Sequence, residues 1–161
     1  MKHFKHILAT TDLSAESLSA VQYAAHLARG QGARLTILHV QETMTLAYAE
    51  ISPPVNLLDL DSRIEAAARA KLEAWLRSHG KGLAAKIVIK KGVIHQTICD
   101  TATAVGASAI VMATHGRKGL KHVLLGSVTE RVLRYAPCPV LVVRPPEPAA
   151  KKKSTAIRKA A

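Results

Sequence analysis

The chain has 161 residues, of which 48% are apolar and 21% are charged, and its net charge is +12 at pH 7. This length suits one domain with a buried core and is too short for two ordinary domains. The sequence contains no apolar stretch long enough to cross a bilayer and begins without the hydrophobic core of a signal peptide, so we expect a cytoplasmic protein.

Much of the positive charge lies at the C-terminal end. Residues 151–161 include five basic residues and no acidic residue, which leaves +7 for the rest of the chain. We predict a folded domain over residues 1–146 and a basic, disordered tail over residues 147–161, whose attraction to polyanions would be non-specific. Because the chain offers only one Phe, one Trp and three Tyr for stacking on bases, specific nucleic-acid binding is not expected.

Cysteines and histidines show no metal-binding pattern. Cys99 and Cys138 have neither the spacing of zinc ligands nor that of a disulfide framework, so we expect two buried thiols. The eight histidines are scattered along the chain. A metal site built from protein side chains is therefore not predicted.

The first half of the chain predicts two strands and two helices. A strand over residues 4–10 leads to Ser14, which can cap a helix that ends near Gly30. Residues 35–40 form a strand that is apolar enough to be buried on both faces, and residues 41–56 form a long connection without a period. Residues 57–79 then form the longest helix. Its apolar stripe comprises Leu60, Ile64, Ala67, Ala68, the stem of Lys71, Leu72, Trp75 and Leu76.

The second half continues the alternation of strands and helices. Strands are predicted over residues 86–90, 109–113 and 140–144, and helices over about residues 95–105 and 127–135. Five strands that alternate with four helices indicate an α/β fold of the Rossmann-like type, a single doubly wound parallel sheet with helices on both faces. In such folds, ligands bind beyond the carboxyl ends of the strands, where the winding direction reverses.

Two strand ends carry suitable chemistry for a ligand. Thr11 and Asp12 follow the first strand, and residues 113–116 follow the fourth. The fourth strand runs into a basic glycine loop, and Gly126 then precedes a helix that begins at Ser127. Glycines allow a backbone to approach a ligand, and a helix start presents unpaired N–H groups, so this stretch is suited to an anion. The alternative is a plain surface turn between a strand and a helix.

These two strand ends together resemble the universal stress protein family. The late loop reads Ala113-Thr-His-Gly116, then nine residues, then Gly126-Ser127, and it continues as VTERVLRYAPCPVLVV. The resemblance covers residues 4–144 and implies a sheet of order 3-2-1-4-5. In many members ATP binds between the first and fourth strands, and members commonly dimerise through the last strand.

The resemblance also implies a set of nucleotide contacts. Asp12 would lie at the adenosine end and Val40 and Met112 against the base, with the glycine-loop residues around the ribose and phosphates. The implied residues are Thr11, Asp12, Val40, Met112, Ala113, Gly116, Arg117, Gly126, Ser127 and Val128. Ala113 stands where the family has its first glycine, and its extra carbon is expected to weaken ATP binding about tenfold without abolishing it.

Two of these residues have purely structural alternatives. Asp12 can orient the turn before Ser14 as an Asx residue. Ser127 and Glu130 have the spacing of a capping box, in which a serine side chain would cap the helix.

The function expected from the resemblance is that of a stress-response sensor or adaptor that binds ATP, with Mg²⁺ carried in by the nucleotide. An enzyme would need an activated nucleophile or a water-positioning base, and the sequence shows neither, so an enzyme is not predicted. The alternatives are a weak ATPase and a dimeric interaction module that binds no ATP. We expect a homodimer in which the last strands pair antiparallel, with protein partners that the sequence does not identify. No membrane partner is expected.

Overall fold

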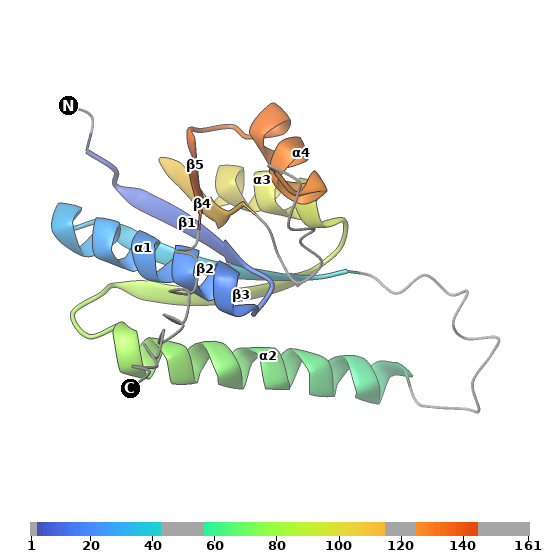
Figure 1. The fold of residues 1–161 in the computed structure, drawn as a ribbon. Coiled ribbons are helices and arrows are strands. Elements are labelled where there is room, and N and C mark those ends of the chain that lie inside the picture. Colours follow the sequence, from blue (N-terminus) through green and yellow to red (C-terminus); the bar gives the residue numbers. More distant parts are fainter. Residues whose placement is uncertain (1–2, 43–56, 115–124, 145–161) are drawn as a thin grey trace, which may run out of the picture.

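The computed structural model describes residues 3–42, 57–114 and 125–144. Five parallel strands form one sheet in the order β3-β2-β1-β4-β5 (Figure 1), which confirms the predicted fold class and strand order. The strands are β1 (His6–Thr11), β2 (Arg34–Gln41), β3 (Ala85–Lys91), β4 (Ala109–Ala113) and β5 (Val140–Val143). The helices are α1 (Ala15–Gln31), α2 (Leu57–His79), α3 (Ile94–Ala104) and α4 (Ser127–Tyr135). The predicted 41–56 connection, except its first two residues, and the 147–161 tail lie outside the described residues.

The sheet has a separate apolar core on each face. The first core cluster joins the sheet to α1 and α2 and includes Val21, Leu72 and Val111. The second core cluster joins the sheet to α3 and α4 and includes Ile98 and Val132. The two pairs of helices lie on opposite sides of the strands (Figure 1). Strands β1 and β4 are buried along their whole length, as expected for the centre of a parallel sheet.

Helix α1 begins and ends as the sequence predicts. Ser14 is the N-cap, and its side chain accepts a hydrogen bond from the backbone N–H of Ser17. At the other end Gly32 adopts the left-handed conformation, with φ of 63°, that glycine adopts without strain. Between them Ala20, Ala24 and Ala28 are fully buried. Their small side chains allow α1 to lie close to the central strands.

Among residues 60–79 of helix α2, the buried positions lie toward its C-terminal end. Ala68 and Leu72 are buried and Trp75 packs against the first core cluster, as predicted. Leu60 and Ile64 of the same stripe, however, are 38% and 43% exposed, so the stripe is not buried along its whole length. The start of α2 extends past the carboxyl ends of the strands in Figure 1, and the exposed pair of Asp61 and Lys91, 3.0 Å apart, joins its second turn to the end of β3.

At the amino-terminal edge of the sheet, where the strands begin, several side chains form a buried hydrogen-bond network. His6 Nδ1 donates to the carbonyl of Val105 at 2.9 Å, and its Nε2 accepts from the hydroxyl of Thr36 at 2.8 Å. Since a carbonyl can only accept, Nδ1 of His6 carries a hydrogen, and in the neutral ring Nε2 is then the acceptor. Burial lowers the pKa of His6 below its usual value, and nearby Arg34 lowers it further against the raising effect of the Val105 carbonyl. Ser108 Oγ accepts from the His6 N–H and donates to the His6 carbonyl.

Candidate functional site

The sheet topology brings the two predicted strand ends to one edge. Strand β1 pairs in parallel with β4, so Asp12 after β1 and Thr114 after β4 both lie at the carboxyl edge. Strand β2 pairs with the other side of β1, and Thr11 lies opposite His39 in this register. The predicted cleft between the first and fourth strands therefore has the topology it needs.

Residues 11–14, which comprise the last residue of β1 and the loop to α1, are called the Asp12 turn below. Asp12 Oδ1 accepts hydrogen bonds from the Ser14 backbone N–H at 3.0 Å and from the Ser14 hydroxyl at 2.6 Å. Thr11 Oγ1 accepts from the Leu13 N–H at 2.9 Å and lies 2.8 Å from the Ser17 hydroxyl. Asp12 thus makes the Asx contact that the structural alternative predicted, and buried Thr11 shapes the same turn.

Leu13 is the strained residue of the Asp12 turn. Its φ is 68°, and it is the one non-glycine residue with positive φ among the residues described. For a residue with a β-carbon, the left-handed conformation costs about 1–2 kcal/mol. The side chain of Leu13 is only 8% exposed and belongs to the first core cluster, so burial offsets part of this cost.

Two donors from other elements hold the carbonyls of the Asp12 turn. His39 Nδ1 on β2 donates to the Thr11 carbonyl at 2.8 Å. Lys71 Nζ on α2 donates to the Leu13 carbonyl at 2.7 Å. The turn is therefore fixed from the sheet and from the longest helix.

The start of α4 forms the other side of the carboxyl edge. The Gly126 N–H donates to the Thr114 carbonyl at 2.9 Å, and Thr129 Oγ1 donates to the Ala113 carbonyl at 3.1 Å. These bonds fix the first turn of α4 to the end of β4. Gly126 is the N-cap and, having no side chain, makes no side-chain capping bond. The backbone N–H groups of the first turn of α4 therefore lack the side-chain acceptor that a serine cap would supply.

The predicted capping box is absent from α4. Ser127 is the first residue of the helix and not its cap, because Gly126 occupies the cap position. Glu130 instead pairs with Arg134 one turn later, at 3.6 Å. The capping-box alternative was therefore wrong, and Ser127 keeps an exposed side chain at the start of the helix.

The other predicted site residues divide between the two faces of the sheet. Val40, Met112 and Val128 come together in the second core cluster. The alternation of a strand places the β-carbon of Ala113 on the opposite face from Met112, toward the side of α1. Gly116 and Arg117 lie outside the described residues.

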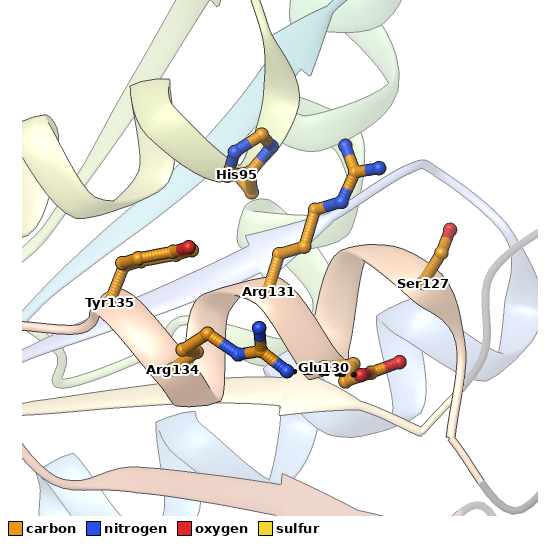
Figure 2. Close-up of a pocket in the computed structure, with 6 residues that line it drawn as sticks. All are labelled: His95, Ser127, Glu130, Arg131, Arg134 and Tyr135. Carbon is orange, nitrogen blue, oxygen red and sulfur yellow. Dashed lines mark ion pairs between the residues drawn. The ribbon is translucent and has the colours of Figure 1, made fainter.

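A hollow of about 460 Å³ lies between α4 and the start of α3. It is lined by His95, Ser127, Glu130, Arg131, Arg134 and Tyr135. Figure 2 shows Ser127 and Arg131 pointing to the same side of α4, the side on which His95 lies. Glu130 pairs with Arg134, whereas Arg131 has no ion pair among the described residues. Ser127 is the residue that the hollow shares with the predicted nucleotide contacts.

The sequence did not predict the roles of four residues at this edge. The sequence assigned Lys71 only to the apolar stripe of its helix, through its side-chain stem. It assigned His39 only to a predicted buried strand. Thr129 and Arg131 lay within a predicted helix without a distinguishing pattern. No local signal marks them, because their contacts join positions that are far apart in the chain or depend on the direction of a helix face.

The described residues offer little other reactive chemistry. Among residues 3–42, 57–114 and 125–144, no three His, Cys, Asp or Glu side chains gather where they could hold a metal ion. Cys99 and Cys138 are free and partly buried; burial raises the pKa of both thiols, and Asp100 adds to this at Cys99. A raised pKa makes a thiol a poor nucleophile at neutral pH. Within the same described residues, no helix is both long and apolar enough to span a membrane.

A five-stranded parallel sheet of this order, with a prepared carboxyl edge, defines a doubly wound α/β domain. The model of the universal stress protein family matches residues 3–144, so the chain belongs to that family. It is 36% identical to universal stress protein A homolog 1 of Coxiella burnetii over 142 residues, which cover 88% of this chain and 96% of that protein.

Solved structures show the same likeness. The structure of protein MJ0577 of Methanocaldococcus jannaschii has a TM-score of 0.79 and 28% identity, and the match covers 91% of this chain and 100% of that one. A universal stress protein solved in complex with cAMP has a TM-score of 0.59 and 24% identity, covering 88% of this chain and 98% of that one. At 24% identity the second likeness concerns the fold alone.

Proposed function

We propose that this protein is a cytoplasmic stress-response sensor or adaptor that binds ATP between β1 and β4. The observation that carries the proposal is the start of α4. Its N-cap is a glycine without a capping side chain, and two hydrogen bonds fix it to the end of β4. A helix start of this kind attracts phosphate through its N–H groups and its partial positive charge.

Residues around this helix start are suited to contact the base and the phosphates of ATP. Val40 and Val128 are partly buried and pack against the core cluster that contains Met112, so they offer an apolar surface of the kind that packs against a base. Arg131 stands one turn beyond Ser127 on the same side of α4 and offers a guanidinium to the phosphates. The fold itself accommodates an adenine nucleotide in the universal stress protein solved with cAMP. Mg²⁺ would arrive with the nucleotide.

We propose binding rather than turnover as the main activity. The carboxylate of Asp12 is engaged by Ser14, and the two thiols have raised pKa values, so neither supplies an activated base or nucleophile. The alternative is a weak ATPase that hydrolyses bound ATP slowly, because the site positions the nucleotide without activating a nucleophile.

The direct test is an absorbance spectrum of the purified protein, followed by mass analysis of the nucleotide released by heat. We expect an adenine nucleotide in the supernatant, and a titration of the stripped protein with ATP that shows saturable heat. A protein that carries no nucleotide and gives no heat with ATP would contradict the proposal. Phosphate release from the same sample measures turnover.

The second proposal is a homodimer that forms through β5. If this dimer bound no ATP, the protein would act as a dimeric interaction module. Strand β5 is at the edge of the sheet, and its Leu141 is 38% exposed. Among the described residues β5 pairs only with β4, so the backbone groups on its other side are available to a second copy of the chain. Leu141→Lys should turn a dimer into a monomer in sedimentation at micromolar concentration. A wild-type protein that sediments as a monomer contradicts this proposal and leaves the ATP proposal intact.

A further inference from the structure

We propose that Lys71 of α2 is a positioning residue that locks the Asp12 turn in its left-handed conformation and so keeps the nucleotide site ready for its ligand. The part that concerns the nucleotide rests on the function proposed above. The lock itself is a statement about the ligand-free protein and can be tested without ATP.

The first support is the position of the Lys71 contact. Its ammonium donates to the carbonyl of Leu13, the residue with φ of 68°, at 2.7 Å. The peptide that follows Leu13 takes its orientation from this left-handed conformation, so the same carbonyl would point elsewhere if Leu13 returned to negative φ. The hydrogen bond is therefore specific to the strained form of the turn.

The second support is that the Lys71 contact differs from the hydrogen bonds made within the turn. Asp12 and Ser14 bond to each other within the turn, and Thr11 bonds to Leu13 and Ser17 nearby in the chain. Such local bonds move with the turn. His39 and Lys71 tie two carbonyls of the turn to distant elements, and His39 holds the carbonyl of Thr11, before the strained residue.

Ligand affinity depends on the fraction of ligand-free molecules in which the Asp12 turn has the binding-competent conformation. A left-handed leucine persists only where its surroundings determine it. Without the ammonium of Lys71, a larger fraction of the ligand-free protein would have a relaxed turn with Asp12 displaced. The apparent affinity falls by the fraction of molecules that keep the competent turn.

The test compares Lys71→Met, which keeps the apolar stem, with Lys86→Met, an exposed lysine of β3 that serves as a charge-matched control. Hydrogen exchange of the Leu13 and Ser14 amides is measured without nucleotide, and ATP affinity by calorimetry. We expect at least tenfold faster exchange at these amides and three- to tenfold weaker ATP binding in Lys71→Met only. Unchanged exchange would overturn the lock.

A second variant separates the lock from a general loosening of α2. Glycine adopts positive φ without strain, so in a Leu13→Gly background Lys71→Met should change ATP affinity less than twofold. An equal loss in both backgrounds would overturn the role of Leu13. If the wild type binds no ATP but exchange still accelerates in Lys71→Met, the proposed function fails and the lock stands.

Discussion

Two buried histidines, one at each edge of the sheet, show how differently the two edges are built. His6 at the amino edge has protein partners for both ring nitrogens, Val105 and Thr36. His39 at the carboxyl edge uses Nδ1 to hold the Thr11 carbonyl of the strained Asp12 turn. The amino edge is a closed polar network, whereas the carboxyl edge combines backbone strain with a helix start that has no capping side chain. Changes at the first should affect stability, and changes at the second should affect binding.

The largest expected effect comes from removing His6. His6→Ala would leave the Thr36 hydroxyl and the Val105 carbonyl without partners in a buried site, and we expect the free energy of unfolding to fall by about 3 kcal/mol. ATP affinity should stay within twofold, since the site lies at the other edge. Urea unfolding and calorimetry measure the two quantities. The exposed His26 of α1 is the control, and His26→Ala should cost less than about 0.5 kcal/mol. A large loss of ATP affinity in His6→Ala would erase the contrast between the edges.

A smaller effect of the same residue is its pH dependence. The pKa of His6 is lowered in the folded protein, so below pH 6.5, the ordinary value, the unfolded chain binds a proton that the folded protein does not. The contribution of neutral His6 to the free energy of unfolding is therefore fully present above pH 6.5. It is lost as the pH falls toward the lowered pKa. Urea midpoints measured between pH 7.5 and pH 5 should fall, and the fall should be shallower in His6→Gln. Parallel curves for the two proteins would remove His6 as the cause.

At the carboxyl edge, the largest expected effect on ligand discrimination comes from Arg131. Arg131→Gln should weaken ATP about tenfold, or about 1.4 kcal/mol, while adenosine affinity changes less than twofold, because the guanidinium is proposed to meet only the phosphates. Arg134→Gln is the matched control, since Arg134 already pairs with Glu130. Calorimetric titration of both variants with ATP and adenosine decides the matter. Equal losses in the two variants would show a general charge effect instead of a contact.

The smallest effect is expected at Ala113. Ala113→Gly introduces the glycine that the family resemblance implies at this position and should tighten ATP binding by a few-fold and by no more than about tenfold. The alternation of β4 places the Ala113 β-carbon on the α1 face, away from Met112, which favours the lower end of this range. Stability should drop by about 1 kcal/mol or less, the usual cost of glycine in a strand. Calorimetry of both proteins measures the affinity, and equal values would show that the methyl group does not intrude.

The elements of this fold could be predicted from the sequence because each has a local cause. Ser14 caps α1 and Gly32 ends it, and the run of apolar residues in β2 predicts burial on both faces. The strand order came from the resemblance to a family and not from the pattern. The Asx contact of Asp12 was also predictable, since it joins residues two apart in the chain.

The residue pattern alone accounts for the set of elements and predicts a ligand at the carboxyl ends of β1 and β4. Which side chains contact those strand ends depends on the tertiary structure. Lys71 reaches Leu13 across 58 positions of chain and His39 reaches Thr11 across 28, and no periodicity records such contacts. Tertiary packing also decided that Gly126, and not Ser127, caps α4, because the bond from the Gly126 N–H to Thr114 fixes where the helix begins. Periodicity reports which face of an element is buried, whereas long-range hydrogen bonds depend on how the buried faces are brought together.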